Sequence, residues 1–412
     1  MHAIQSTEGR LLRITAALVV LILTAWPTAV ADHPGDILLR THIDEADVDA
    51  ELFIPRQSIA VRGILVHAVH YKLSTHDRWA TLCRELKFAH LVTSIDLKTN
   101  NRPRRLREAM LAALDEFAAR TGRKELPHVP RAGVGMSAGG MCIPMLIEQP
   151  DKMLTNAVSC SWVTDPAKIG PEKAAIPEMY VIGAISDGFK MLPAIDRFYV
   201  PAVKAGRPWA LGLQHGCAHD WANSGTLFLP WIRAIAELRL PEQMQPGEAV
   251  ILKDVSFGQG WRGDRSTIDG QFATIIPAAE YRGRPGDVVW LPNRAVACVW
   301  RAFQTKDSPV HLTAQTGDGS VKLPKFNPRV SFGMTARSGS DIVLGVNVKA
   351  LAVVGDVRFF QGEQLIGRLD DPADVLTWRR PRDRAYAVWA QYELDGRQAV
   401  TNPALICIEQ LD

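Results

Sequence analysis

Hydrophobic and polar positions divide the chain into two regions with different periodicities. Between about residues 59 and 240, short apolar runs alternate with segments whose apolar side chains recur at helical spacing. The runs that predict strands are Ile59–Val66, Ala89–Leu97, His128–Val134, Asn156–Trp162, Met179–Ile185 and Trp209–Gln214, preceded by one or two edge strands within Asp36–Ile54. The segments that predict helices are Arg78–Phe88, Arg104–Thr121, Ala138–Glu148, Leu192–Ala205 and Ser224–Leu240. This alternation is typical of a mainly parallel, doubly wound α/β sheet, in which sites lie beyond the carboxyl ends of the strands.

From about Ser308 the pattern changes to short alternating runs with turn residues between them. The candidate strands are Val321–Leu323, Val330–Thr335, Ile342–Val348, Val357–Gln361, Gln364–Leu369, Val375–Arg379, Ala385–Glu393 and Ala404–Glu409. This rhythm predicts a smaller, all-β antiparallel sandwich. We therefore expect an α/β domain over residues 32–241, a connecting strap over 242–307 and a sandwich domain over 308–412.

The strap is rich in aromatic residues, with Trp261, Tyr281, Trp290 and Trp300 lying among glycines and prolines. Its two apolar runs, at residues 288–292 and 295–303, predict a strap with a short helix that packs on the α/β domain. Buried aromatic side chains dominate core energetics, so core packing is the expected role of these residues. A sugar-binding platform is the alternative.

The N-terminal segment has the pattern of a signal peptide. Arg10 and Arg13 precede the apolar run Ile14–Leu23, and Ala29-Val30-Ala31 is a small-residue cleavage pattern. The run is too short for an ordinary membrane span, although a signal anchor is the alternative. We expect cleavage after residue 31 and export to the periplasm or the cell exterior, with no stable membrane span in the mature chain.

Charge and cysteine usage narrow the possible partners. The net charge of +3 gives no electrostatic case for nucleic-acid binding. The six cysteines are scattered, without metal-ligand spacing, so no metal and no other cofactor is expected. Buried free thiols are the default, and a disulfide between Cys160 and Cys217 is the alternative.

One stretch, Gly133–Gly140, carries a Gly-x-Ser-x-Gly motif centred on Ser137. A predicted strand precedes it and a predicted helix follows it, the latter kinked at Pro144. A serine on such a sharp turn is lifted above the sheet edge, and the N–H of Ala138 then points to where an oxyanion would form. A glycine-rich turn with an incidental serine is the alternative.

A serine nucleophile needs a base, and the base needs an acid that orients it. His219 follows the predicted strand 209–214, and Asp187 follows the predicted strand 179–185. Both therefore belong to the edge of the sheet where Ser137 is expected. Asp165 and Asp196 are alternatives for the acid, and His215 is the alternative for the base.

These residues resemble the α/β-hydrolase superfamily, and are most similar to its secreted esterase-like members. The stretches that carry the resemblance are Arg62–Val66, Gly135–Gly140, Ser186–Gly188, Pro208–Leu211 and Ala218–Asp220. The resemblance implies a Ser-His-Asp hydrolase that acts through an acyl-enzyme on a small-molecule or polymer-borne ester. A serine peptidase or a lipase on the same fold is the alternative, because fold and triad do not set the substrate.

The loop after the early strand departs from that family. It reads His67-Ala68-Val69-His70-Tyr71, without the usual glycine. The backbone N–H of Val69 or His70 is expected to serve as the second oxyanion donor. The bulk of the loop motivates a different hypothesis, a non-catalytic binding protein on a hydrolase scaffold.

The C-terminal region resembles bacterial Ig-like modules that are appended to secreted enzymes. The resemblance rests on Val357–Gly367, Trp378 and Ala385–Tyr392, and the charged run Arg380–Arg384 replaces the usual glycine turn. Such modules imply spacing, stability or weak polymer binding rather than catalysis, and a cell-surface adhesion role is a further alternative.

Overall fold

The computed structural model describes residues 35–410, with gaps at 45–46, 57, 59, 70–75, 95–101, 141–148, 162–164, 166–174, 186–188, 244–249, 269–271 and 350–353. The expected signal peptide, Pro144, Cys142, His70 and Asp187 therefore lie outside the described residues.

Eight strands form one mainly parallel sheet, as the alternation of strands and helices predicts. They are β1 (Ile37–Ile43), β2 (Val48–Ile54), β3 (Gly63–Val69), β4 (Phe88–Ser94), β5 (Arg131–Met136), β6 (Met153–Ser159), β7 (Glu178–Gly183) and β8 (Trp209–Gln214). Their order in the sheet is β1-β2-β4-β3-β5-β6-β7-β8. The β1–β2 and β2–β4 pairs are antiparallel, and all the other pairs are parallel.

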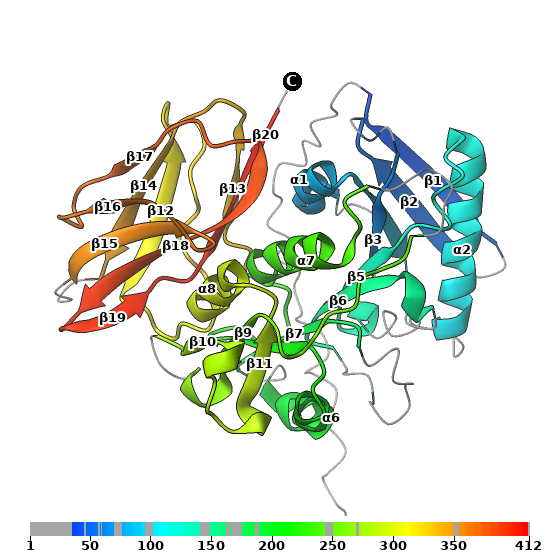
Figure 1. Cartoon of the computed structure of the whole chain (residues 1–412). Coiled ribbons are helices and arrows are strands. Elements are labelled where there is room, and N and C mark those ends of the chain that lie inside the picture. The colour runs from blue at the N-terminus through cyan, green and yellow to red at the C-terminus, as the bar shows by residue number, and fades with distance from the viewer. Residues whose placement is uncertain are drawn as a thin grey trace, which may run out of the picture. The chain divides into compact units, whose positions relative to one another are not determined.

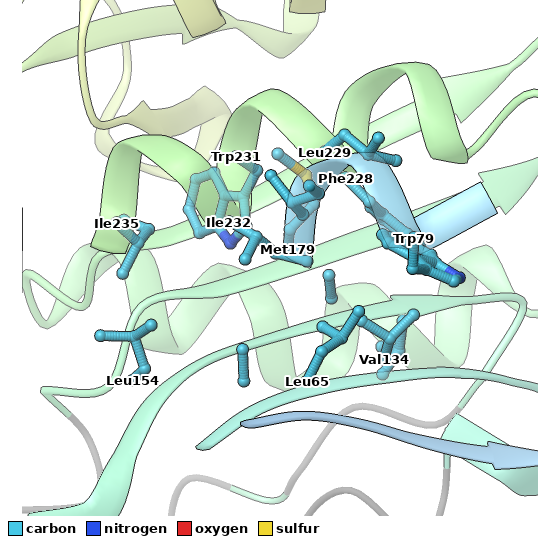
Figure 2. Close-up of a cluster of buried hydrophobic side chains, with 14 of the residues drawn as sticks. Leu65, Trp79, Val134, Leu154, Met179, Phe228, Leu229, Trp231, Ile232 and Ile235 are labelled. Atoms are coloured by element: carbon cyan, nitrogen blue, oxygen red, sulfur yellow. The ribbon is translucent and has the colours of Figure 1, made fainter. Parts of the chain in front are cut away.

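Helices cover both faces of this sheet, which buries strands on each side. They are α1 (His76–Leu86), α2 (Arg102–Thr121), α6 (Leu192–Lys204) and α7 (Gly225–Arg239). The helices α1 and α2 lie on opposite sides of the first strands, and α7 crosses the middle of the sheet (Figure 1). Figure 2 shows the buried face of α7, where Phe228, Trp231 and Ile235 point toward strand residues such as Leu154.

The start of three strands differs from the prediction. The strand β5 begins at Arg131 instead of the expected His128. The run Ile59–Val66 predicts a strand, but β3 begins at Gly63 and continues to Val69. Val61 is buried without belonging to the strand, so hydrophobicity alone places the start too early. The strand β6 begins three residues before the expected Asn156, directly after a short 3-10 helix at Pro150–Lys152.

The strap forms a three-stranded sheet, in the order β10-β9-β11, and a helix. Its elements are β9 (Trp261–Asp264), β10 (Ile275–Pro277), β11 (Val288–Leu291) and α8 (Arg294–Phe303), with 3-10 helices at Arg265–Thr267, Ala278–Glu280 and Pro285–Asp287. The indole of Trp300 donates to the Leu211 carbonyl at 2.8 Å, and Gln304 Oε1 accepts from the Leu213 N–H at 2.8 Å. The strap therefore satisfies backbone groups on the free edge of β8, which would otherwise be open to pairing with another chain.

Two of the aromatic residues in the strap have the expected core role. Trp290 and Trp300 are buried, and Trp290 packs edge-on against Trp231 of α7 with ring centroids 5.7 Å apart. Burial of both rings excludes them from a sugar-binding platform, while Trp261 and Tyr281 are half-buried.

Residues 308–410 form two sheets that share a second hydrophobic core, here called the C-terminal sandwich. One sheet contains β12 (Val310–Thr316), β14 (Ile342–Val348) and β17 (Leu376–Trp378). The other contains β13 (Gly333–Arg337), β20 (Ala404–Glu409), β18 (Arg384–Leu394), β15 (Val354–Gln361) and β16 (Gln364–Leu369), with β19 (Arg397–Val400) paired to β18. The pairing is antiparallel except between β13 and β20.

Two strands of the sandwich are absent from the prediction, and one predicted strand is wrong. The missing strands are β12 and β19. Buried and more exposed residues alternate along β12, but one of the buried residues is the small Ala314, which weakens the hydrophobic pattern in the sequence. The predicted strand Val321–Leu323 is instead the return from a turn, where Thr316 and Val321 are joined by a backbone hydrogen bond of 2.9 Å. Its β-pairing is limited to an isolated bridge between Gln315 and Lys322.

An ion-pair network joins α1 and α7 to the C-terminal sandwich. Arg233 on α7 donates two hydrogen bonds of 2.6 Å to the Glu85 carboxylate on α1, and a third to the Ala385 carbonyl at 2.7 Å. Arg384 of β18 approaches Glu85 at 2.9 Å. The two helices therefore pack between the large sheet and the sandwich (Figure 1).

Glu178 at the start of β7 makes the stability of the fold depend on pH. Burial raises the pKa of its carboxyl from 4.5 to about 7, although the Tyr180 hydroxyl donates to it. Because the folded state holds the proton more tightly than the unfolded state does, this stabilisation is present below pH 4.5 and is lost as the pH rises through 7.

We therefore expect Glu178→Gln to remove a pH-dependent component of about 3 kcal/mol from the unfolding free energy between pH 4 and pH 8, at about 1.4 kcal/mol per pKa unit. Urea unfolding of both proteins across this range measures it. Identical pH slopes for the wild type and the variant would contradict the prediction.

Candidate active site

The strand β5 leads into a strained turn at Ser137. The φ angle of Ser137 is 53°, in the left-handed region that non-glycine residues rarely adopt, and helical backbone begins at Ala138. Two hydrogen bonds hold this conformation: the Ser137 N–H donates to the Ser159 carbonyl at 3.0 Å, and Ser161 Oγ donates to the Ser137 carbonyl at 2.8 Å. The described part of the motif thus has the strand, sharp turn and helix start that a nucleophile elbow needs.

The glycines of the motif are required by close backbone packing. A Cβ atom on Gly135 would lie 2.6 Å from the Gly140 nitrogen, and one on Gly139 would lie 2.3 Å from the Ala68 carbonyl oxygen. A Cβ atom on Gly140 would lie 2.5 Å from Cβ of Ser161. These distances leave no room for any side chain, so the turn can form only with glycine at these three positions.

The same packing brings together the two residues that the sequence predicts as oxyanion donors. Val69 ends β3 and is half-buried, and its nitrogen is bonded to the Ala68 carbonyl carbon. That carbon lies 3.3 Å from the position of a Cβ on Gly139, the neighbour of Ala138. The backbone amides of Val69 and Ala138 therefore belong to one corner of the sheet edge, beside Ser137.

His219 lies on the loop of residues 215–224 between β8 and α7, which we call the histidine loop. The histidine is exposed, but hydrogen bonds hold the residues on either side of it to the end of β6. Cys160 Sγ donates to the Ala218 carbonyl at 3.6 Å, and Ser159 Oγ donates to the Asp220 carbonyl at 3.4 Å.

Ser159 is the link between the two parts of the site, because its own carbonyl binds the N–H of Ser137. The structure thus brings Ser137 and the histidine loop to the same strand end. Within the described residues, no hydrogen bond joins the His219 ring to Ser137 Oγ; such bonds are often long before substrate binds.

The end of β7 also packs against the histidine loop. A Cβ atom on Gly183 would lie 1.9 Å from the Ala218 carbonyl oxygen, and the Ile185 N–H donates to the Cys217 carbonyl at 3.0 Å. Asp187 itself lies outside the described residues, two positions beyond Ile185. The chain that leads to it is therefore bonded directly to the loop that carries His219.

The alternative site residues have other contacts. Asp196 forms an ion pair with Arg265 at 2.7 Å, and His215 Nε2 lies 3.2 Å from the Ile268 carbonyl. Asp165 is half-buried, and residues on both sides of it lie outside the described part. The structure thus gives Asp196 and His215 partners away from Ser137.

The cysteines near the site are free thiols. Cys160 and Cys217 are both buried and unbridged, and both sulfurs lie 3.6 Å from the Ala218 carbonyl oxygen. Burial raises the pKa of the Cys217 thiol to about 12, so it is protonated at neutral pH. The structure therefore shows the free thiols that the sequence favours over the Cys160–Cys217 disulfide.

Residues 159–161, Ser-Cys-Ser, support the elbow and the histidine loop from the end of β6. From the sequence, Cys160 is only a possible disulfide partner, and Ser159 and Ser161 have no predicted role. The sequence shows a run of small polar residues at the end of a predicted strand. This run indicates support for the turn at Ser137 only once β6 is known to lie next to β5. Their hydroxyl and thiol groups donate to backbone carbonyls of the elbow and the histidine loop.

A cluster of four rings involves β3, β4, α1 and the histidine loop. His67 on β3 stacks on His90 of β4 with centroids 5.9 Å apart, and lies 5.6 Å from the ring of Trp221 in the histidine loop. Trp79 of α1 completes the cluster at 6.2 Å from Trp221. His67, Ala68 and Val69, which the sequence analysis assigns to a loop, belong to the strand β3, and His67 is buried among these rings.

The described residues contain no group of three or more His, Cys, Asp or Glu residues arranged to hold a metal ion. In the same part of the chain, every helix is too short or too polar to cross a bilayer.

Comparisons with known proteins give structural likenesses only at low identity. No family model matches the chain, and no curated protein matches its sequence. The chain is similar to an S-formylglutathione hydrolase from Agrobacterium tumefaciens, with 11% identity over 49% of this chain and 95% of that one and a TM-score of 0.34. A thermostable carboxylesterase cloned from a metagenomic library shows 15% identity over 49% and 88%, with a TM-score of 0.36.

A shorter likeness involves 23% of the chain. It is to fibronectin(III)-like modules of Clostridium thermocellum CbhA, at 22% identity over 94% of that chain, with a TM-score of 0.18.

Proposed function

We propose that this chain is an exported serine hydrolase of the α/β-hydrolase type that cleaves carboxylic esters. The observation that carries the proposal is Ser137, held at φ 53° at the end of a central parallel strand by packing that tolerates only glycine around it. Backbone strain of this kind costs about 1–3 kcal/mol and persists where function requires the geometry. The C-terminal sandwich would be an Ig-like module of such an enzyme.

In this proposal, Ser137 Oγ attacks the ester carbonyl while His219 accepts its proton. The amides of Ala138 and Val69 donate to the oxyanion of the tetrahedral intermediate, which collapses to an acyl-enzyme as His219 returns the proton to the leaving alcohol. Water, activated by His219, then releases the acid. Asp187 is proposed to orient the imidazole, in line with the bond between Ile185 and the histidine loop.

The experiment that tests this proposal is labelling of the purified chain with a fluorophosphonate, followed by mass mapping of the modified peptide. We expect one phosphonyl group per chain, attached to Ser137, because only an activated serine reacts at a useful rate. A folded chain that does not react, or that reacts at another serine, would contradict the proposal and favour a binding protein on a hydrolase scaffold.

A further inference from the structure

We propose that Gln214 and Asn223 are positioning residues, which hold the histidine loop in its working place by tying it to the C-terminal sandwich. This inference rests on the proposed function, since it assigns a purpose to the loop that carries His219. In this role the sandwich would affect the rate of the reaction itself, whereas a spacer or a polymer-binding module would not.

Gln214 closes the base of the histidine loop. Its buried side chain accepts a hydrogen bond from the Asn223 N–H at 3.2 Å through Oε1, which joins the two ends of the loop. Its Nε2 donates to the Pro328 carbonyl of the sandwich at 2.8 Å. One amide therefore joins the two ends of the loop and also attaches the loop to the sandwich.

Asn223 makes a second, independent attachment. Its buried amide donates to the Pro403 carbonyl at 2.8 Å and accepts from the Phe332 N–H at 3.2 Å. These partners lie in two separate segments of the sandwich. Only a side chain with a donor and an acceptor can satisfy both, so neither alanine nor aspartate replaces it.

The loop backbone is fixed at two further points. Ser331 Oγ donates to the carbonyl of Ala222, which has a strained φ of 36°. A Cβ atom on Gly216 would lie 2.8 Å from Cγ of Pro328, so the sandwich presses on the other arm of the loop as well. The His219 segment is thus clamped between the end of β6 on one side and the sandwich on the other.

Such a clamp has a catalytic consequence. Holding reacting groups in a near-attack geometry removes entropy from the barrier, and a displacement of about 1 Å can cost about 10²-fold in rate. The bonds from β6 and β7 hold the residues around His219, but a loop still samples many conformations when few contacts hold it. The four hydrogen bonds with the sandwich, together with the packing of Gly216 on Pro328, add to this restraint.

The two regions also touch away from the loop, which provides a matched control. Asn402 Nδ2 donates to the Thr305 carbonyl at 3.1 Å, next to the Asn223 contact at Pro403 but without reaching the histidine loop. If the sandwich only adds stability, losing either asparagine should have similar consequences.

The test compares Asn223→Ala and Ser331→Ala with Asn402→Ala in the full chain. The rate of fluorophosphonate labelling is measured from pH 5 to pH 9, and amide hydrogen exchange is measured in the peptide that contains residues 215–224. For Asn223→Ala we expect about 10- to 100-fold slower labelling, a changed pH profile and faster exchange confined to this peptide. Ser331→Ala removes one hydroxyl, so it should slow labelling and speed exchange by smaller amounts than Asn223→Ala does. Asn402→Ala should change neither the labelling rate nor the exchange in this peptide.

Loop exchange and labelling that are unchanged in Asn223→Ala, or changed equally in Asn402→Ala, would overturn the inference. A wild-type chain that does not label would instead refute the proposed function. If the wild-type chain does not label, hydrogen exchange in residues 215–224 of Asn223→Ala still shows whether Asn223 holds the loop. If Asn223→Ala does not fold, the same measurement on Ser331→Ala shows whether the sandwich holds the loop.

Discussion

Replacing Ser137 with alanine is expected to lower kcat/KM for p-nitrophenyl butyrate by at least about 10³-fold, because the acyl-enzyme can no longer form. The fold should be unaffected. The bonds that hold the turn come from the backbone N–H and carbonyl of residue 137, and alanine keeps both. Kinetics with this ester and the unfolding midpoint in urea measure the two effects separately.

The matched control is Ser161→Ala, which removes the hydroxyl that donates to the Ser137 carbonyl but leaves the proposed nucleophile in place. A loss of one hydrogen bond costs about 1 kcal/mol, so a modest decrease in stability and a partial loss of rate are expected. If Ser137→Ala retained turnover while remaining folded, another residue would have to be the nucleophile.

Gly183→Ala should also slow ester turnover strongly, although residue 183 takes no part in the proposed chemistry. Its Cβ atom would lie 1.9 Å from the Ala218 carbonyl oxygen and 2.5 Å from that of Cys217, so the backbone of the histidine loop has to move. We expect at least about 10²-fold slower ester turnover, the cost of displacing a catalytic group by about 1 Å.

Steady-state kinetics and fluorophosphonate labelling of the variant check this expectation. The control is Gly355→Ala in the sandwich, where the nearest atom to a Cβ lies 3.6 Å away and alanine fits at ordinary contact distance. Near-normal turnover in Gly183→Ala would mean that the loop can shift without moving its histidine away from Ser137.

Local patterns were enough to predict the α/β sheet and the turn at Ser137. The periodicity and length of the apolar runs located the strands β1 to β8. The spacing of the motif glycines matches the close backbone contacts that these glycines make in the structure. Strand starts were less predictable, as at β3, because Val61 is buried by neighbours outside the strand. The role of Asp187 stays a prediction.

The attachment of the histidine loop to the sandwich had no local signal. Gln214 and Asn223 pair with Pro328 and Pro403, which are separated from them by 114 and 180 residues. A glutamine at a strand end and an asparagine before a helix are ordinary in sequence. Their role depends on how the sandwich packs against the histidine loop, which the periodicity of the sequence does not encode.

The separation of 180 residues between Asn223 and Pro403 also has a consequence for biosynthesis. A ribosome adds about 5–20 residues per second, so the histidine loop is made roughly 10–40 s before the segment that Asn223 binds. Through that interval the large sheet can form while the loop lacks one of its attachments. The histidine loop would therefore gain all of its attachments only after the sandwich segment around Pro403 has been made.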